Sequence, residues 1–244
     1  MNLSDNTILI TGGATGIGFA LVEELHSRGN RIIICGRRED RLRQVQEKYP
    51  DVIIRVCDVT DKAQREDLFA WAASSYPELN ILVNNAGIQH YIDFNKGTKE
   101  LDLYESEVDV NLTAPIHLCG LFVPLLSKKA NAVIINISST LGVLPIVSAP
   151  VYCASKAGFH IFTRCLRKQL QDTSVKVFEV LPPAVESELN ARGRAKQQGR
   201  SYVPADVYAA LVIAGLEKDT YEINSEYLEK MQNASLRDAN IFLG

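Results

Sequence analysis

The sequence predicts an α/β fold in which helices cover both faces of a doubly wound parallel sheet. Short runs that are almost wholly apolar alternate with longer segments of helical periodicity as far as Leu181. Strands that are apolar at nearly every position belong to a sheet buried on both faces, because half-buried strands alternate instead. Right-handed crossovers through the intervening helices then wind such a sheet in both directions.

Six apolar runs are expected to form the strands: Thr7–Ile10, Arg31–Cys35, Val52–Val56, Asn80–Val83, Ala132–Ile137 and Val175–Leu181. Helical spacing is found over 16–29, 39–49, 62–75, 103–129 with a bend near Pro115, 150–171 and 204–217. The polar, basic stretch 190–201 is expected to be a loop. No Pro/Gly/Ser-rich linker or charge block divides the chain, so one domain over 1–244 is expected, with a short substrate loop at about 186–203.

The composition excludes several classes of protein. The 244 residues carry a net charge of −3, which does not favour a nucleic-acid binder. The apolar stretch 112–126 falls short of the roughly 20 residues of a membrane span, and no signal peptide is evident. The five cysteines form no C-x-x-C pair and the four histidines are scattered, so neither a disulfide framework nor a metal site is expected. A cytoplasmic location fits a chain of free cysteines.

A glycine-rich turn follows the first expected strand directly. In TGGATGIG, Gly12, Gly16 and Gly18 lie between that strand and the first helix, with Thr15 and Ile17 in the same turn. Glycines let backbone N–H groups approach a pyrophosphate, and the helix N-terminus favours the anion. Glycines also make plain turns, but this position predicts a Rossmann-type dinucleotide site to which these five residues contribute.

Two arginines, Arg37 and Arg38, follow the second strand where an NAD site usually has an acidic residue. Arginine binds a ribose 2′-phosphate through charge-assisted hydrogen bonds, so NADP(H) is preferred and NAD(H) stays possible. The alternative is that both arginines lie in a solvated turn and pair with Glu39 or Asp40.

Two further strand ends are candidates for cofactor contacts. Asp58, followed by Val59, either caps the next helix or accepts a hydrogen bond from adenine, and the sequence alone weighs these equally. Asn85, Ala86 and Gly87 follow the strand that ends at 83, and small residues there let a cofactor lie on the strand end.

The strongest catalytic signal is the set Ser139, Tyr152 and Lys156. Tyr152 and Lys156 are four residues apart on an expected helix and therefore share one face. A lysine ammonium beside a phenol is expected to lower the phenol pKa and to make Tyr152 an acid or base near neutral pH. Ser139 ends a strand at the carboxyl edge of the sheet, where it is placed to hold a carbonyl oxygen.

Taken together, these motifs resemble the short-chain dehydrogenase/reductase family over roughly 5–190. The resemblance implies an NAD(P)-dependent oxidoreductase acting on a carbonyl or alcohol, with Tyr152 as acid/base, Ser139 orienting the substrate oxygen and Lys156 binding the nicotinamide ribose. It also implies that Asn111 holds a water of a proton relay. The runs ICGRREDRL and LPPAV are closer to one subgroup, the oxidoreductases encoded with the D-alanyl-lipoteichoic acid genes of Gram-positive bacteria.

The chain departs from the family pattern near its C-terminus. Pro183 stands in place of a glycine, so the expected contacts to the nicotinamide carboxamide come from the Val185 backbone and the Ser187 hydroxyl. The usual glycine-rich seventh strand is not evident. The resemblance implies a homodimer through two long helices, and this departure puts a tetramer in doubt.

The segment 140–151 is mostly apolar and is expected to wall the substrate site with Gln89, His90 and Tyr91, which predicts a neutral or hydrophobic substrate. Alternatively, Leu144, Ile146 and Val147 face the core or a dimer partner. A non-catalytic dinucleotide-binding regulator or a scaffold protein is the rival function, and the intact set of Ser139, Tyr152 and Lys156 argues against it.

Overall fold

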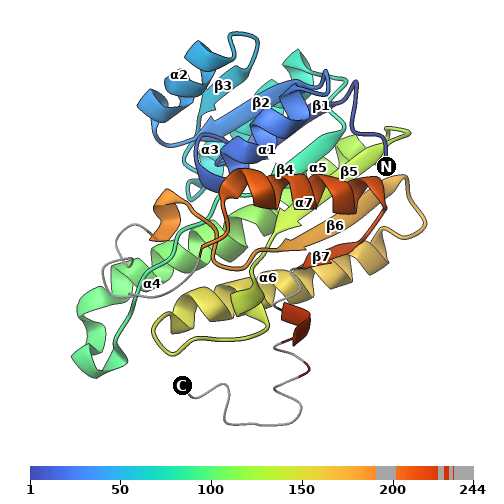
Figure 1. Ribbon diagram of the computed structural model, residues 1–244. Coiled ribbons are helices and arrows are strands. Elements are labelled where there is room, and N and C mark those ends of the chain that lie inside the picture. The colour runs from blue at the N-terminus through green and yellow to red at the C-terminus, as the bar shows by residue number, and fades with distance from the viewer. Residues whose placement is uncertain (191–201, 225–227, 231–232, 234–244) are drawn as a thin grey trace.

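The computed structural model describes residues 1–190, 202–224, 228–230 and 233. Seven parallel strands form one sheet in the order β3-β2-β1-β4-β5-β6-β7 (Figure 1). Their bounds are β1 (Thr7–Thr11), β2 (Arg31–Gly36), β3 (Ile53–Val56), β4 (Ile81–Asn84), β5 (Ala132–Ile137), β6 (Val175–Leu181) and β7 (Glu222–Asn224). The expected fold class is confirmed, and the six predicted strands differ from the observed ones by at most one residue at either end.

The seventh strand corrects the sequence expectation. Glu222–Asn224 pairs with Glu179–Leu181 of β6 and buries the side chain of Ile223. A three-residue strand has too little apolar periodicity to be recognised in the sequence. It forms because its backbone completes the edge of a sheet that already exists.

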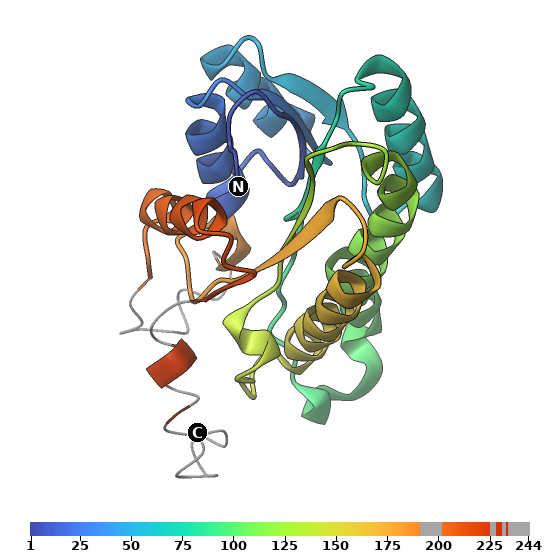
Figure 2. The ribbon, with the colours of Figure 1, turned by 90° about the vertical axis from the view of Figure 1, so that its right-hand side faces the viewer.

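Helices cover both faces of the sheet, as Figure 2 shows. One face carries α1 (Gly16–His26), α2 (Glu39–Lys48) and α7 (Ala205–Glu217), and the other carries α3 (Lys62–Ser75), α4 (Leu101–Val108), α5 (Ala114–Leu126) and α6 (Pro150–Gln169). Alternate strand residues divide between two apolar cores. Ile8 and Ile10 pack towards α1 and α7, whereas Leu9 packs towards α3 and α5.

The predicted helix over 103–129 is interrupted by the π-helical turn Asp109–Thr113, which separates α4 from α5. Pro115 supplies no backbone N–H to the preceding turn, which explains why the regular hydrogen-bond pattern breaks there. In the described part of the chain, Asp102–Leu126 is the one helical run with the length and hydropathy of a membrane span. Its buried side chains, among them Leu118 and Phe122, belong to a core of the sheet, so these two properties are weak evidence for a span.

The order of the strands reverses between β1 and β4, and a seam of hydrogen bonds joins their ends. The Thr11 hydroxyl accepts from the backbone N–H of Asn85 and of Ala86, both at 3.0 Å. The Asn85 side chain donates to the carbonyls of Thr11 and Gly12 at 2.9 and 3.0 Å. The loops after β1 and β4 are thereby held side by side, at the edge where ligands of such sheets bind.

Candidate active site

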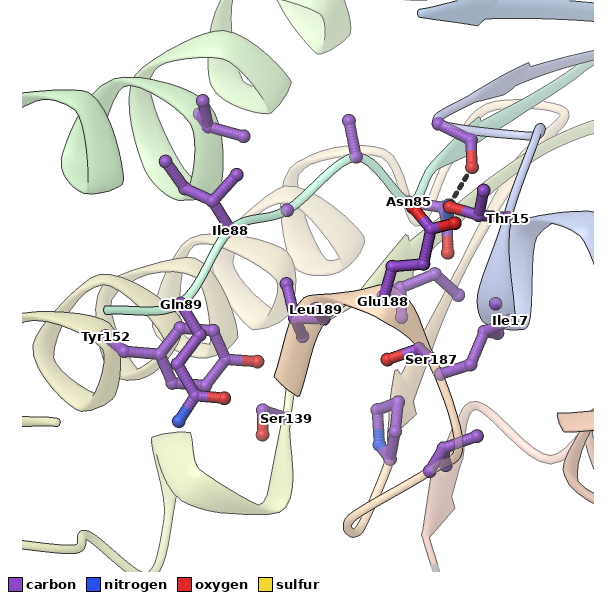
Figure 3. Close-up of a pocket in the computed structure, with 18 of the residues that line it drawn as sticks. Thr15, Ile17, Asn85, Ile88, Gln89, Ser139, Tyr152, Ser187, Glu188 and Leu189 are labelled. Carbon is purple, nitrogen blue, oxygen red and sulfur yellow. Dashed lines mark hydrogen bonds between the residues drawn. The ribbon is translucent and has the colours of Figure 1, made fainter. Parts of the chain in front are cut away.

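A cleft of about 1200 Å³ opens along the carboxyl edge of the sheet. One end contains Arg37, Arg38 and Arg41, and the other contains Ser139, Tyr152 and Lys156. The glycine-rich turn and the segment after β6 form the walls between these ends (Figure 3). Predicted residues that line the cleft are Gly12, Thr15, Gly16, Ile17, Arg37, Arg38, Val59, Asn85, Ala86, Gly87, Ser139, Tyr152, Lys156, Val185 and Ser187.

Three predicted site residues, Gly18, Asp58 and Asn111, are not among those that line the cleft. A Cβ atom on Gly18 would lie 2.3 Å from the Gly12 carbonyl oxygen and 2.4 Å from Asn85 Nδ2. Gly18 is therefore needed for close packing between the first turn of α1 and the glycine-rich turn, not for a surface that faces a ligand.

Asp58 is not the cap of the following helix. The N-cap of α3 is Asp61, whose side chain accepts from the N–H groups of Ala63 and Gln64. Asp58 instead accepts from the backbone and hydroxyl of Thr60 at 2.9 and 2.8 Å. The capping alternative was wrong because α3 begins at Lys62, which leaves Asp61 and not Asp58 at the N-cap position. The carboxylate of Asp58 lies 3.9 Å from Arg37.

The arginines after β2 do not pair as the solvated-turn alternative expects. The Arg38 guanidinium contacts Glu188, from the short helix η4 (Glu188–Asn190), and it lies 3.5 Å from the Thr15 hydroxyl. Arg41 lies 2.8 Å from the other oxygen of Glu188. Glu39 pairs with Arg43 instead. Both Arg37 and Arg38 border the cleft, with about half of each side chain exposed.

Tyr152 and Lys156 lie on the first two turns of α6, which begins with Pro150, a residue favoured at the first helical position. Lys156 Nζ donates to the Ile137 carbonyl at 3.0 Å and lies 5.9 Å from the centre of the Tyr152 ring. Ser139 caps the short helix η3 (Thr140–Gly142), and its hydroxyl accepts from the N–H of Leu141 at 3.1 Å. All three side chains are buried on the floor of the cleft.

Burial is the main cause of the pKa shifts of Tyr152 and Lys156. It raises the pKa of the Tyr152 phenol, and a hydrogen bond with Ser139 opposes the rise. It also lowers the pKa of Lys156 to about 8, although Glu179 and Glu107 favour the charged ammonium. The predicted lowering of the Tyr152 pKa by Lys156 is not found in this structure. The physical reason is burial. Removing the phenolate from water disfavours this charged form by more than the positive charge of Lys156 could favour it.

Asn111 lies in the π-helical turn, directly behind the cleft. Its side chain accepts from the N–H of Ile88 at 3.0 Å and donates to the Ile88 carbonyl at 2.8 Å. It also donates to the Ser155 hydroxyl at 3.3 Å. These bonds tie the segment after β4 and the helix α6 to the π-helical turn, and they give Asn111 a positioning role in this structure.

Glu107 is a buried carboxyl group beside the site that the sequence analysis missed. It lies one helical turn before Asn111 and has no solvent exposure. Its Oε1 accepts from the His90 N–H at 2.6 Å, while Oε2 has no hydrogen-bond partner among the described residues. Burial raises the pKa of Glu107 to about 7, opposed by the His90 N–H and by Lys156. The sequence gives little signal for it, because Asp102 and Glu105 on the same helix make Glu107 one acidic residue among several.

The substrate end of the cleft has mainly apolar walls. Leu141, Leu144, Pro145 and Ile146 line it, together with Gln89, His90 and Tyr91, as the sequence analysis expected. Val147 is 70% exposed and does not line this cleft. The predicted loop 190–201 lies almost entirely outside the described residues, and of the segment 186–203 the structure places 186–190 and 202–203.

The residues present fit a nicotinamide dinucleotide. Gly16 has a φ of 56°, which glycine adopts without strain, and it lines the cleft at the N-terminus of α1. The arginines line the same cleft as Tyr152 and Lys156. The cleft therefore has cationic groups for a phosphate at one end and a phenol at the other. No group of His, Cys, Asp and Glu side chains suited to a metal ion occurs in the described parts of the chain, and all five cysteines are free thiols.

Comparison with known proteins identifies the family. The family model described as short chain dehydrogenase matches residues 6–198. The chain belongs to the short-chain dehydrogenase family. It is accordingly an oxidoreductase that depends on NAD or NADP, as the motifs predicted.

One relative and two solved structures are similar to this short-chain dehydrogenase over nearly its whole length. It is 45% identical to the uncharacterized oxidoreductase DltE of Bacillus subtilis (strain 168), over 98% of this chain and 95% of the relative, which confirms the predicted subgroup. A short-chain dehydrogenase of Burkholderia cenocepacia J2315, solved with NADP, has a TM-score of 0.84 at 24% identity, with 99% and 97% of the two chains covered. One of Burkholderia phymatum, solved with NAD, has a TM-score of 0.87 at 20% identity, with 100% and 96% covered. At these identities the two structures are similar in fold.

Glu107 makes the stability of this protein depend on pH. Its pKa rises from 4.5 in an unfolded chain to about 7 in the folded protein, so folding favours the protonated acid. The stability that this acid contributes is complete below pH 4.5 and is lost as the pH rises through about 7. Glu107→Gln has no charge to bury, so above pH 7 we expect its free energy of unfolding to exceed that of the wild type by about 1–3 kcal/mol.

Denaturant unfolding at pH 5 and pH 8 measures this difference. Glu105→Gln is the matched control, because Glu105 is an exposed carboxylate on the same helix. A difference between Glu107→Gln and the wild type that does not change with pH would contradict the burial of a titrating carboxyl group.

Proposed function

We propose that this enzyme transfers a hydride between a nicotinamide dinucleotide and the carbon of a carbonyl or alcohol group, with Tyr152 as the proton donor. The observation that carries the proposal is the meeting of Ser139, Tyr152 and Lys156 on the floor of a cleft whose other end is built for a dinucleotide. Bound there, the dinucleotide supplies or accepts the hydride. A regulator or scaffold protein without catalytic activity would not need the buried phenol of Tyr152 and the buried ammonium of Lys156 at the end of this cleft.

The proton step is assigned to the Tyr152 hydroxyl. A phenol whose pKa is raised by burial keeps its proton at neutral pH, so it is ready to protonate the oxygen of a carbonyl under reduction. The Ser139 hydroxyl, two residues beyond the end of β5, is placed to hold the same oxygen (Figure 3). Lys156 is held by the Ile137 carbonyl, where its ammonium faces the cleft and the Tyr152 ring. The apolar walls favour a neutral carbonyl compound over a carboxylated one.

Tyr152→Phe removes the proton donor and nothing else from the cleft. We expect it to lower kcat by about a hundredfold or more, as the loss of a positioned acid does, while nucleotide affinity stays within about twofold. The measurement is oxidation of NADPH and NADH with a panel of apolar aldehydes and ketones, beside calorimetric titration of the nucleotides.

Tyr208→Phe is the control for this substitution. Tyr208 is a buried tyrosine of α7, and its hydroxyl has no hydrogen-bond partner in the described part of the chain. Its loss should leave activity unchanged. Full activity of Tyr152→Phe would refute the assigned proton step.

For the cofactor, we propose a preference for NADP(H), with NAD(H) as a weaker alternative. Arg38 borders the cleft beside the glycine-rich turn, and it is joined there by Arg37 and Arg41. Guanidinium groups bind phosphate in two-point contacts, and the end of β2 is where the ribose 2′ position lies in dinucleotide folds.

Arg38→Gln should therefore weaken NADPH binding by about tenfold and NADH binding by less than about twofold. Calorimetry or fluorescence titration measures both affinities. Arg43→Gln removes the same charge from α2 at a residue that pairs with Glu39 and does not line the cleft. An equal loss of affinity for both nucleotides would contradict the preference.

A homodimer in the cytoplasm is proposed as the working state of a single catalytic domain. The outer faces of α5 and α6 expose apolar side chains, with Ile116 at 36% and Ile161 at 56% exposed. Burying them against the same helices of a second chain would remove this surface from water. Light scattering is expected to give twice the mass of one chain, and the mass of one chain would overturn this part of the proposal.

A further inference from the structure

One carboxylate of the protein occupies the arginines that are proposed to hold the cofactor phosphate. One oxygen of Glu188 contacts Arg38 Nη1, and the other lies 2.8 Å from Arg41 Nη2. Arg38 also reaches the Thr15 hydroxyl of the glycine-rich turn at 3.5 Å. Three segments thus meet in this cluster: the turn after β1, the start of α2 and the segment after β6.

The cluster is an anion site by its chemistry. Two guanidinium groups that hold both oxygens of one carboxylate present the same donors that a phosphate monoester accepts. The pKa of Glu188 is lowered, chiefly by its hydrogen bond to Arg38, so the carboxylate is ionised at neutral pH. Arg38, Arg41 and Glu188 all line the cofactor cleft, so the internal carboxylate and a bound phosphate would compete for one place.

A neighbouring contact holds the same segment against the glycine-rich turn. Ser187 packs on Gly16 so closely that a Cβ atom on this glycine would lie 2.8 Å from the Ser187 Cβ. Figure 3 shows Ser187, Glu188 and Leu189 crossing between Thr15 and Ile17 on one side and Ser139 and Tyr152 on the other. Ser187 and Glu188 thus lie directly along the path between the two ends of the cleft.

We propose that Glu188 is an internal competitor for the 2′-phosphate: it binds Arg38 and Arg41 in the free protein and releases them when a nucleotide carrying that phosphate binds. The inference rests on the proposed preference for NADP(H). Only the molecules in which Glu188 has left the arginines can bind such a nucleotide. The apparent affinity is therefore the intrinsic affinity multiplied by the fraction of these molecules. Because Leu189 lines the same cleft as Tyr152, release of Glu188 also changes the wall of the substrate end.

Glu188→Gln tests the competition, since it keeps the size of the side chain and removes its charge. The probes are adenosine 2′,5′-bisphosphate and AMP, which differ in the 2′-phosphate alone, titrated by calorimetry at low salt. For an exposed carboxylate between two arginines, we expect the variant to bind the bisphosphate about three- to tenfold more tightly and AMP within about twofold of the wild type.

Glu39→Gln is the matched control. It removes the same charge close to Arg38, but Glu39 pairs with Arg43 and does not line the cleft. Both replaced side chains are more than 40% exposed, so neither substitution disturbs a core. The control should leave both affinities unchanged, and an equal gain for Glu39→Gln would overturn the inference as a general effect of charge.

The remaining outcomes separate the inference from the proposed function. A wild type that prefers the bisphosphate, with no further gain in Glu188→Gln, keeps the NADP(H) preference and overturns the competition. A preference seen in Glu188→Gln alone supports the competition and overturns the preference of the wild type. Equal binding of the two probes by both proteins overturns both.

Discussion

The cleft depends on the hydrogen bonds that join the ends of β1 and β4. The single hydroxyl of Thr11 accepts from two consecutive N–H groups after β4, and the Asn85 side chain returns two bonds to the end of β1. Neighbouring parallel strands end at the same edge, but their loops leave in opposite directions at this point of the sheet. Without the seam, the glycine-rich turn and the segment after β4 would not form two walls of one cleft.

The end of the cleft that contains Tyr152 has several buried ionisable side chains nearby, although such side chains are usually exposed to solvent. Lys156, Glu107 and Glu179 are all buried, and each has fixed polar partners. Lys156 donates to Ile137, Glu107 accepts from His90, and Glu179 lies 2.9 Å from His160. Burying such groups costs stability even when they are paired, so the two carboxyl groups that act on Lys156 mark a site where function outweighs stability.

The segment after β6 connects the two ends of the cleft. Its start is tied to the sheet, because the Pro182 carbonyl accepts from the N–H and the hydroxyl of Thr140. Further along, Ser187 and Glu188 contact the glycine-rich turn and the arginines, and Leu189 faces the substrate end. A ligand that displaces Glu188 therefore acts on a wall shared with the substrate, which couples the two ends through one short piece of chain.

The sequence by itself determined the parts of this protein that follow from local rules. Apolar runs and helical spacing predicted six strands and the helices between them, since periodicity reports burial directly. The glycine-rich turn and the spacing of Tyr152 and Lys156 were visible because each motif lies within one turn or one helix face. The family assignment rested on these motifs and is confirmed.

Tertiary structure alone decided what depends on contacts between distant segments. The strand β7 exists because β6 offers an edge, and Asp61 caps α3 in place of Asp58 because it directly precedes the first helical residue. The pKa of Tyr152 is set by burial, which the spacing of Tyr152 and Lys156 does not contain. The contact of Glu188 with Arg38 joins residues 150 positions apart, and neither residue alone indicates it. Desolvation and long-range ion pairs arise from the folded arrangement, so no local pattern could have predicted them.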